Sequence, residues 1–441
     1  MSKKIFQGKK VTVMGLGLHG GGVGVAKFFC EQGAEVLVTD LKTEEKLEDS
    51  INKLKGLKIK YTLGKHQEAD FISADLIIKN PDVPSTSPYL EIAKKNNVPV
   101  ETDVSLFFKL SGAFIIGVTG TKGKSTTSSL IYHIIKTKYK NTFLAGNIGV
   151  SPLELLSEVK KGDKVVLELS SFELEDLTQS PNIAVITNIL PDHLNRYGTM
   201  EEYIKSKKII FEYQTKKDHL ILNEDDDILR RFAEERSKIS IVRQFSLNNK
   251  PKDINLDNLK LLGEHNLQNI LAAIEVAKIL KIPEKTIEKA LKTFKGVPSR
   301  QEFIREVRGV KYFNDTTATM PDATITAIRV FLENFPNSRL ILICGGQNKG
   351  LKYEKLAEII RERVDEVIML PGTASDKIKE NLKNYTRVHE VSLMQEAVKK
   401  AKEFSEKGDV VILSPAAASF NLFKNEFDRG DQFVKAVKNL K

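Results

Sequence analysis

The stretch from Ile115 to Ser129, IIGVTGTKGKSTTSS, constrains the fold of this chain more than any other segment. An apolar run ends at Gly117, a glycine-rich turn follows, and serine and threonine residues then open a helix. Glycines let backbone N–H groups converge on an anion, and the N-terminus of the following helix adds a partial positive charge. The stretch therefore predicts a strand, a phosphate-binding loop and a helix, which is typical of an α/β protein with a parallel sheet.

The polar residues of this loop favour a nucleotide as its ligand. Lys124 would reach the β- and γ-phosphates, and Ser125 or Thr126 would reach a magnesium ion. The strict spacing G-x-x-x-x-G-K-[ST] is not met, because Gly117 lies six residues before Gly123. An ordinary glycine-rich turn is the alternative, but Gly-Lys-Ser-Thr-Thr at the junction of strand and helix favours the phosphate loop. The residues expected to bind the nucleotide here are Gly120, Thr121, Lys122, Gly123, Lys124, Ser125 and Thr126.

Length and composition describe a globular protein of several domains. At about 150 residues per domain, a chain of 441 residues suggests three domains. Hydrophobic residues make up 41% and charged residues 29%, no apolar run is long enough to cross a bilayer, and the first ten residues lack the apolar core of a signal peptide. The two cysteines lie far apart in apolar surroundings, which suits reduced thiols in the cytoplasm. The net charge is +10, but the lysines are spread along the chain and mixed with acidic residues, so we expect no nucleic-acid binding. Without a long apolar run we expect no membrane insertion either.

The first domain is expected to span residues 1–109 and to be Rossmann-like. A strand from Lys10 to Met14, a turn with glycines at 15, 17 and 20, a helix, and a second strand that ends at Asp40 form a β-turn-α-β unit. The spacing G-x-G-x-x-G followed by an acid is typical of a dinucleotide site. It is a weak signal, because any ligand that carries a pyrophosphate can use the same turn. From the residues alone His19 is a loop residue without assigned chemistry.

The central domain is expected to span residues 110–297 and to contain a parallel sheet of the P-loop ATPase type. A strand from Lys164 to Leu169 carries Glu168 near its end, and another from Ile183 to Asn188 leads to His193. Ligands of open parallel sheets collect at the carboxyl ends of the strands. Each of the two residues alone is best explained as a surface polar group, but beside a phosphate loop they become candidate ligands of magnesium.

The third domain is expected to span residues 298–441, with Pro298 at the junction. Three short apolar runs each lead into a loop rich in small polar groups, namely at 314–319, 345–350 and 414–415. This pattern predicts a second, smaller parallel α/β sheet of the Rossmann-like type, with its loop edge toward the nucleotide site.

Six motifs, in their order and at their separations, resemble those of the Mur ligases, the ATP-dependent amide-forming enzymes of peptidoglycan precursor synthesis. They are GVTGTKGKSTT, GNIG, LELSSFELE, TNILPDHLNRYG, YIKSKK and GEHNLQN. The resemblance covers nearly the whole chain. Within the family, the turn GLGLHG and the segment LSPAAASFNLFKNEFDRGDQF are similar to the members that add D-glutamate to UDP-N-acetylmuramoyl-L-alanine.

The resemblance implies roles for individual residues, with ATP, two magnesium ions and a carbamylated lysine as cofactors. It implies a cytoplasmic, monomeric enzyme that acts on small molecules. The catalytic residues would be Lys124, His193 and Lys207. The metal ligands would be Ser125, Glu168, His193 and Lys207. Further ATP contacts would be Asn269, Arg300 and Asp315. The UDP-substrate would contact Gly17, Leu18, His19, Asp40, Asn80 and Asn147. D-Glutamate would contact Thr319, Lys349, Ser419 and Phe420.

Two positions depart from the family pattern, and one assignment depends on helical spacing. Some members carry a lysine where Thr317 stands, and others place a phenylalanine directly after the asparagine that corresponds to Asn425. The carbamylated lysine maps onto Lys207 and not Lys208, because Lys207 follows Tyr203 by one helical turn. A surface lysine is the alternative for this position.

Three other functions compete with the ligase. A nicotinamide-dependent dehydrogenase would explain the first glycine turn and Asp40 but leave the loop at Lys124 without a purpose, and NADH binding distinguishes it. A folylpolyglutamate-type ligase shares the ATP half but would lack the N-terminal glycine turn. A non-catalytic nucleotide-binding regulator would need damaged catalytic positions, whereas Lys124, Glu168 and His193 are intact.

Overall fold

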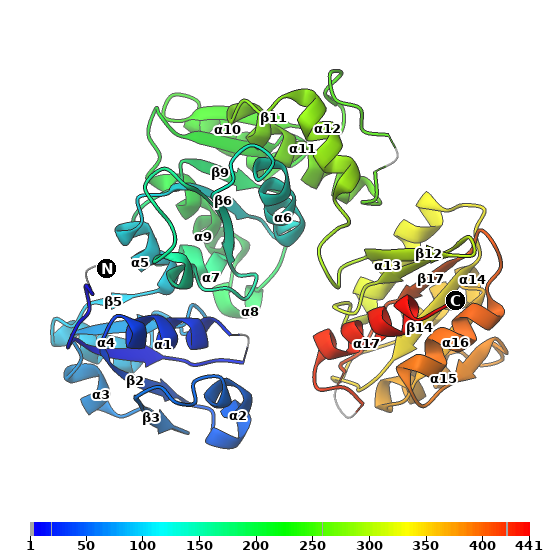
Figure 1. The fold of residues 1–441 in the computed structure, drawn as a ribbon, viewed down its shortest axis with the longest axis horizontal. Helices are drawn as coiled ribbons and strands as arrows, with labels where there is room; N and C mark the ends of the chain where they lie inside the picture. Colours follow the sequence, from blue (N-terminus) through cyan, green and yellow to red (C-terminus); the bar gives the residue numbers. More distant parts are fainter. Residues whose placement is uncertain (1–3, 19, 258, 420–421) are drawn as a thin grey trace. The chain divides into compact units, whose positions relative to one another are not determined.

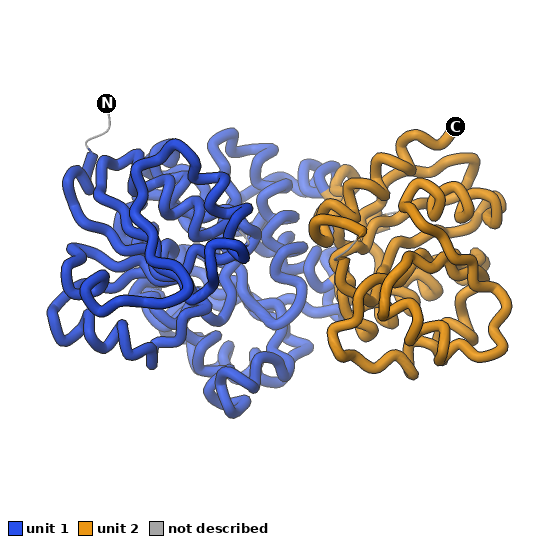
Figure 2. The backbone as a smooth tube through the Cα atoms, turned by 90° about the horizontal axis from the view of Figure 1, so that it is seen from below, with its two compact units in different colours: residues 1–255, 268–290 blue, residues 256–267, 291–441 orange. Residues whose placement is uncertain are grey.

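The structure is a computed structural model that describes residues 4–18, 20–257, 259–419 and 422–441. The chain divides into two compact units (Figure 2): unit 1 comprises residues 1–255 and 268–290, and unit 2 comprises residues 256–267 and 291–441. Two of the predicted site residues, His19 and Phe420, lie outside the described residues.

Unit 1 begins with a parallel sheet in the order β3-β2-β1-β4-β5 (Figure 1). Its strands are β1 (Lys10–Met14), β2 (Glu35–Asp40), β3 (Ile59–Leu63), β4 (Leu76–Lys79) and β5 (Val100–Glu101). Its helices are α1 (Gly21–Glu31), α2 (Glu44–Asn52), α3 (Glu68–Ile72), α4 (Pro88–Lys95) and α5 (Asp103–Leu110). The strand order reverses between β1 and β4, so the loops after these two strands border the crevice in which doubly wound folds bind ligands. The predicted β-turn-α-β unit is confirmed.

The second sheet of unit 1 is also parallel, in the order β11-β10-β9-β6-β8-β7. Its strands are β6 (Phe114–Thr119), β7 (Thr142–Gly146), β8 (Lys164–Glu168), β9 (Ile183–Ile186), β10 (His219–Asn223) and β11 (Ile241–Phe245). The helical segments are α6 (Lys124–Ile135), η1 (Pro152–Leu155), α7 (Ser171–Leu174), α8 (Leu194–Tyr197), α9 (Met200–Glu212) and α10 (Asp227–Arg236). Most of α11 (Glu264–Ile279) and α12 (Glu284–Thr293) also belongs to unit 1, which includes residues 268–290. The strands β6, β8 and β9 are buried along nearly their whole length, as expected for a sheet covered by helices on both faces.

The two sheets of unit 1 share one hydrophobic core. At the seam between them the Ser151 hydroxyl donates to Asp103 Oδ2 (2.7 Å), which joins the start of η1 to the start of α5. Helix α1 approaches η1 so closely that a Cβ on Gly24 would lie 2.2 Å from Glu154 Oε1. A side chain at position 24 would therefore have to displace the Glu154 carboxylate, whose Oε1 accepts from the Ser151 N–H (3.2 Å).

Unit 2 contains one sheet in the order β12-β13-β17-β14-β15-β16. Its strands are β12 (Glu302–Val307), β13 (Val310–Asn314), β14 (Leu340–Gly345), β15 (Glu366–Leu370), β16 (Val388–Glu390) and β17 (Val410–Leu413). Its helices are α13 (Pro321–Asn334), α14 (Glu354–Arg363), α15 (Thr373–Asn381), α16 (Met394–Phe404) and α17 (Glu426–Lys438).

The edge strand β12 is an addition to the predicted parallel sheet, because it runs antiparallel to β13. The connecting turn contains Arg308 (φ 53°) and Gly309 (φ 81°), and positive φ at both positions is the geometry of a tight hairpin. The remaining strand pairs of this sheet are parallel, as predicted. Within the described part of the chain, no helix combines the length and apolar character needed to cross a membrane.

Candidate active site

A cavity of about 470 Å³ in unit 1 receives residues from both of its sheets. The loops that follow β1, β4, β6 and β9 all border it, and these loops lie at the carboxyl ends of their strands. Predicted site residues that line the cavity are Gly17, Leu18, Asn80, Thr121, Lys124, Asn147, His193 and Lys207. The fold thus brings the first glycine turn and the phosphate loop to the same cavity.

The phosphate loop has the backbone conformation that its sequence predicts. Helix α6 begins at Lys124, directly after Gly123, which adopts a left-handed conformation (φ 83°). A Cβ on Gly120 (φ 144°) would lie 2.0 Å from Thr187 Oγ1, so glycine is required there. The Lys124 ammonium group donates to the carbonyl oxygens of Gly120 (3.0 Å) and Thr121 (2.9 Å) and therefore lies over the loop. Ser125 and Thr126 are half-buried in the first turn of α6.

Asn188 and Thr187 hold the phosphate loop in place through hydrogen bonds to its backbone. The sequence analysis assigned them no role. The Asn188 side chain accepts from the Lys122 N–H (2.9 Å) and donates to the Lys122 carbonyl (3.0 Å). The Thr187 hydroxyl donates to the same carbonyl (2.6 Å), and the Thr121 N–H donates to the Asn188 carbonyl (2.9 Å). The only sequence signal is a Thr-Asn pair at the end of a buried strand.

Glu168 ends β8 and is 1% exposed. Its Oε1 accepts from Asn147 Nδ2 (3.0 Å), whereas Oε2 is buried and has no hydrogen-bond partner among the described residues. A buried carboxylate oxygen without a donor is costly, and a cation would remove that cost. No group of three or more His, Cys, Asp or Glu side chains among the described residues forms a metal cage. Magnesium ordinarily binds one or two carboxylates together with phosphates, so Glu168 fits such an ion.

His193 follows β9 in a left-handed conformation (φ 52°) and precedes α8. Its ring lies 5.0 Å from the ring of Phe172, and its Nε2 lies 3.9 Å from Asp192 Oδ2. About half of the side chain is exposed at the cavity. The histidine can therefore meet a ligand without rearrangement of the core.

Two adjacent lysines of helix α9, Lys207 and Lys208, have different surroundings. Lys207 is 1% exposed, and its ammonium group donates to the Thr119 hydroxyl (3.1 Å) and the Gly120 carbonyl (3.2 Å) at the phosphate loop. Burial and the nearby charge of Lys124 lower the pKa of Lys207 to about 7. Lys208 points elsewhere and pairs with Glu235 (2.7 Å) at the surface.

Asp40 does not line the cavity; it stabilises the first glycine turn through hydrogen bonds to the backbone of that turn. Its Oδ2 accepts from the N–H groups of Leu16 (2.9 Å) and Gly17 (3.2 Å), and its Oδ1 accepts from the Lys42 N–H (2.8 Å). Asn80 does line the cavity, and its Nδ2 lies 3.4 Å from the Gly15 carbonyl oxygen.

Asn269 in α11 lies against the phosphate loop. Its Oδ1 accepts from the Thr127 hydroxyl (3.1 Å) and would lie 2.3 Å from a Cβ placed on Gly123. This residue therefore belongs to the surroundings of the loop, within unit 1.

Unit 2 carries the other predicted residues, where the loops after β13, β14 and β17 meet. The Ala416 N–H donates to the Ala318 carbonyl (2.8 Å), and Gln347 pairs with Ala418 as a β-bridge. These contacts gather Thr319, the exposed Lys349 and the buried Ser419 on one edge of the sheet. Arg300 is exposed in the same unit, whereas Asp315 is buried.

Sequence profiles and full-length relatives agree on the family. The profiles of the MurD-like N-terminal domain, the Mur ligase middle domain and the glutamate ligase domain of Mur ligases match residues 9–102, 118–260 and 299–417. The UDP-N-acetylmuramoylalanine–D-glutamate ligase of Roseiflexus sp. (strain RS-1) is 39% identical over 98% of this chain and 99% of its own. The same-named protein of Clostridioides difficile (strain 630) is 37% identical over 99% of each chain. The chain belongs to the Mur ligase family.

Solved structures share the fold of this Mur ligase. The crystal structure of the UDP-N-acetylmuramate-alanine ligase MurC from Thermotoga maritima has a TM-score of 0.62 at 22% identity and covers 98% of this chain and 100% of its own. The MurF ligase from Thermotoga maritima in complex with ADP has a TM-score of 0.57 at 18% identity and covers 99% of each chain.

Both positions at which the chain departs from the family pattern make or adjoin local hydrogen bonds. The Thr317 hydroxyl donates to the Ser299 carbonyl (2.9 Å). Asn425 caps α17, because its Oδ1 accepts from the N–H groups of Phe427 (3.0 Å) and Asp428 (2.9 Å). Phe427 is exposed at the first turn of this helix.

Arg429 is a further residue that sequence reasoning missed. Its guanidinium is fully buried and donates to the hydroxyl (3.0 Å) and carbonyl (2.8 Å) of Thr316 and to the Ala417 carbonyl (3.1 Å). It therefore ties together the loops after β13 and β17, which carry Thr319 and Ser419.

We expect Arg429→Met to destabilise unit 2 by about 3 kcal/mol or more, because it leaves buried acceptors without donors at a cost of about 1–3 kcal/mol each. Thermal unfolding measures the loss. The control is Arg305→Met, since Arg305 donates to the Lys438 carbonyl at an exposed edge of the same unit. Equal stability of the two variants would contradict the role of Arg429.

Asp315 should make the stability of unit 2 depend on pH. Its Oδ1 accepts from the Gln301 N–H (3.2 Å) and its Oδ2 from the Ser414 hydroxyl (2.9 Å), and burial raises the pKa of Asp315 from 3.8 to about 7. A folded-state pKa above the unfolded value means that the folded state binds the proton more tightly. The contribution of Asp315 to stability therefore falls as the pH rises from about 4 to about 7, and then levels off.

Asp315→Asn keeps one of the two acceptor oxygens and cannot ionise. The melting temperature of this variant, relative to that of the unsubstituted protein, should rise by a few degrees between pH 5 and pH 8. Thermal unfolding at four or five pH values provides the measurement. A constant difference across this range would show that Asp315 is not protonated in the folded state.

Proposed function

We propose that this Mur ligase joins D-glutamate to UDP-N-acetylmuramoyl-L-alanine at the expense of ATP, in cytoplasmic peptidoglycan precursor synthesis. The observation that supports this best is the cavity of about 470 Å³ in unit 1, which is lined by Gly17 and Asn80 from the loops of the first sheet and by Lys124 from the second. Such a cavity suits a reaction that brings a UDP-linked carboxylate to the γ-phosphate of ATP.

The chemistry explains why both halves of the cavity are needed. A carboxylate oxygen of the UDP-substrate attacks the γ-phosphorus of ATP, and ADP leaves, which gives an acyl phosphate. The amine of D-glutamate then attacks the acyl carbon and loses a proton, and the tetrahedral intermediate expels phosphate to leave an amide. The protein must hold anionic groups together and keep water away from the acyl phosphate.

Lys124 is the group best placed to offset the charge of the transferring phosphoryl group, since its ammonium lies over the phosphate loop. The backbone N–H groups at the start of α6 add to this effect. Asn188 and Thr187 keep the loop in place while charge moves across it. A desolvated site makes each of these interactions stronger than it would be in water.

Magnesium is part of this proposal. Glu168, Ser125 and His193 would hold it, together with Lys207 in carbamylated form as a second anionic ligand group. Two ions would supply positive charge at the β- and γ-phosphates. The depressed pKa of Lys207, to about 7, favours the neutral amine that carbon dioxide requires.

Unit 2 would supply the amino acid and further ATP contacts. Lys349 would pair with a carboxylate of D-glutamate, with Thr319, Ser419 and Phe420 as further contacts, and Arg300 and Asp315 would contact ATP. We also propose that the enzyme is monomeric, which light scattering at several concentrations tests. The division into domains at 1–109, 110–297 and 298–441 likewise remains a proposal.

The test is phosphate release from ATP with UDP-N-acetylmuramoyl-L-alanine and a panel of L- and D-amino acids, with the product identified by mass. We expect release above background with D-glutamate only, and a product heavier by one glutamate residue. Turnover with a different amino acid would redirect the proposal to another acceptor. Phosphate release without any amide product would refute it.

A further inference from the structure

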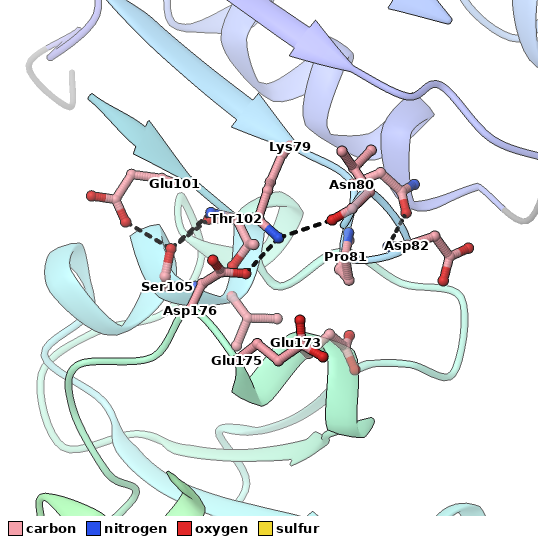
Figure 3. Close-up of polar contacts among 12 residues, drawn as sticks. Lys79, Asn80, Pro81, Asp82, Glu101, Thr102, Ser105, Glu173, Glu175 and Asp176 are labelled. Carbon is pink, nitrogen blue, oxygen red and sulfur yellow. Dashed lines mark hydrogen bonds and ion pairs between the residues drawn. The ribbon is translucent and has the colours of Figure 1, made fainter. Parts of the chain in front are cut away.

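The loop from Asn80 to Val83 carries a cavity residue of the first sheet, yet side chains of the second sheet fix its position. Figure 3 shows this loop between β4 and the segment that follows α7. Within the loop, the Asp82 N–H donates to Asn80 Oδ1 (3.0 Å) and the Val83 N–H donates to the Asn80 carbonyl (2.9 Å). The loop is thus a tight turn whose orientation depends on its outside contacts.

Arg196 provides the first of these contacts. Its guanidinium donates to the carbonyl oxygens of Asp82 (3.0 Å) and Pro81 (3.3 Å), and to Glu175 Oε2 (3.0 Å). Arg196 Cζ lies 4.1 Å from the centroid of the Phe172 ring, and a cation–π contact of this kind restricts the guanidinium further. The arginine therefore has partners on three sides.

Glu175 and Phe172 connect this arginine to the histidine side of the cavity. The Tyr197 hydroxyl donates to Glu175 Oε1 (2.6 Å), so both oxygens of the carboxylate are engaged. The ring of Phe172 also contacts His193, at 5.0 Å between centroids. Arg196 lies in α8, which begins directly after His193. The short segment 193–197 thus carries both the candidate metal ligand His193 and Arg196, which holds the loop from Asn80 to Val83.

Lys79 provides a second anchor on the other side of the loop. It is 2% exposed, and its ammonium group lies 2.8 Å from Asp176 Oδ2 and donates to the Val83 carbonyl (3.2 Å). Figure 3 shows the Lys79 nitrogen pointing toward the Asp176 carboxylate. Asp176 follows Glu175 in sequence, so neighbouring acids serve the two anchors.

We propose that Arg196 is a positioning residue that sets where Asn80 and the UDP-substrate lie relative to His193 and the phosphate loop. This inference rests on the proposed function, because it concerns the substrate named there. The bonds of Arg196 to two backbone carbonyls fix the loop whatever side chains stand at positions 81 and 82. The alignment of the carboxylate with the γ-phosphate would then depend on α8, and a misplacement of about 1 Å can slow such a transfer about a hundredfold.

The main test compares Arg196→Ala with Arg243→Ala in steady-state kinetics. Arg243 also pairs with a glutamate, Glu275 at 3.3 Å, but lies on β11 away from the cavity lining. We expect Arg196→Ala to raise the KM for the UDP-substrate about tenfold or more and to lower kcat, with the KM for ATP within about twofold. Arg243→Ala should change none of the three.

Chemical rescue separates positioning from a general loss of folding. Guanidinium at tens of millimolar, far below denaturing concentrations, should restore part of the activity of Arg196→Ala by binding between Phe172 and Glu175. It should not restore the double variant Arg196→Ala with Glu175→Gln. Unchanged kinetics of Arg196→Ala, or an equal rise in the KM for ATP without rescue, would overturn the proposal.

Hydrogen exchange tests, without any substrate, whether Arg196 holds the loop from Asn80 to Val83. Arg196→Ala should speed exchange of the amides of residues 82 and 83 while residues 120–126 keep the rate of the unsubstituted protein. Equal exchange rates at residues 82 and 83 in both proteins would show that Arg196 does not hold this loop. If the unsubstituted protein makes no amide product, the proposed function fails, and this measurement still decides the role of Arg196.

Discussion

Lys124→Ala should abolish turnover in a protein that still folds and still binds the UDP-substrate. The side chain is half-buried at the first residue of α6, and its ammonium group donates to the carbonyl oxygens of Gly120 and Thr121, so we expect its removal to leave the hydrophobic core intact. Loss of one preorganised charge at a transferring phosphoryl group costs at least several hundredfold in rate, about 10²–10³ by analogy with oxyanion donors. Phosphate release gives the rate, and calorimetry gives substrate affinity.

The matched control for Lys124 is Lys136→Ala, which removes an exposed lysine after the other end of the same helix. Its side chain donates to the Tyr132 hydroxyl (2.6 Å) at the surface, so we expect turnover within about twofold. Near-normal turnover of Lys124→Ala would show that the loop does not act on phosphate. A melting temperature far below that of the control would show a structural role instead.

Lys207→Ala should be nearly inactive and should regain part of its activity with acetate. The ammonium group of Lys207 is buried at the Thr119 hydroxyl and the Gly120 carbonyl, and its pKa is lowered to about 7, so a neutral amine is accessible near physiological pH. Carbamylation would convert a cation that repels magnesium into an anionic oxygen ligand. A short carboxylate can supply the same oxygens in the space that the alanine leaves.

Lys208→Ala controls for this experiment within the same helix. Lys208 has the same chemistry but pairs with Glu235 at the surface, so its removal should leave the rate within about twofold. Mass spectrometry under carbon dioxide trapping conditions should find the modification on Lys207 alone. Full activity of Lys207→Ala, or inactivity of Lys208→Ala, would show that the assignment is wrong.

The parts of the fold that could be predicted are those set by local pattern. The β-turn-α-β unit from Lys10 to Asp40 and the strand, loop and helix around Lys124 depend on apolar periodicity and on glycines at fixed offsets, and both are confirmed. The burial of Lys207 follows from its helical spacing to Tyr203, another buried residue of α9.

The residues that were missed act on the backbone of distant segments. Asn188, Arg196 and Arg429 all donate to main-chain carbonyls, and every residue offers a carbonyl, so no partner side chain marks these contacts in the sequence. The antiparallel strand β12 was also not predicted, because the only sequence signal of its hairpin is the pair Arg308-Gly309. Such contacts can be recognised only in the folded structure, because they join segments that are distant in the sequence.

Asp40 changes how a mutational scan of the first domain would be read. In a dinucleotide fold an acid at this place hydrogen-bonds the ribose of the ligand, whereas here both of its oxygens accept from backbone N–H groups of Leu16, Gly17 and Lys42. Selection for a correctly formed turn is enough to retain the aspartate, even where no ligand touches it. Substitutions of Asp40 would therefore lower the amount of folded protein in the cell. An assay of protein abundance should detect this loss as strongly as an assay of activity.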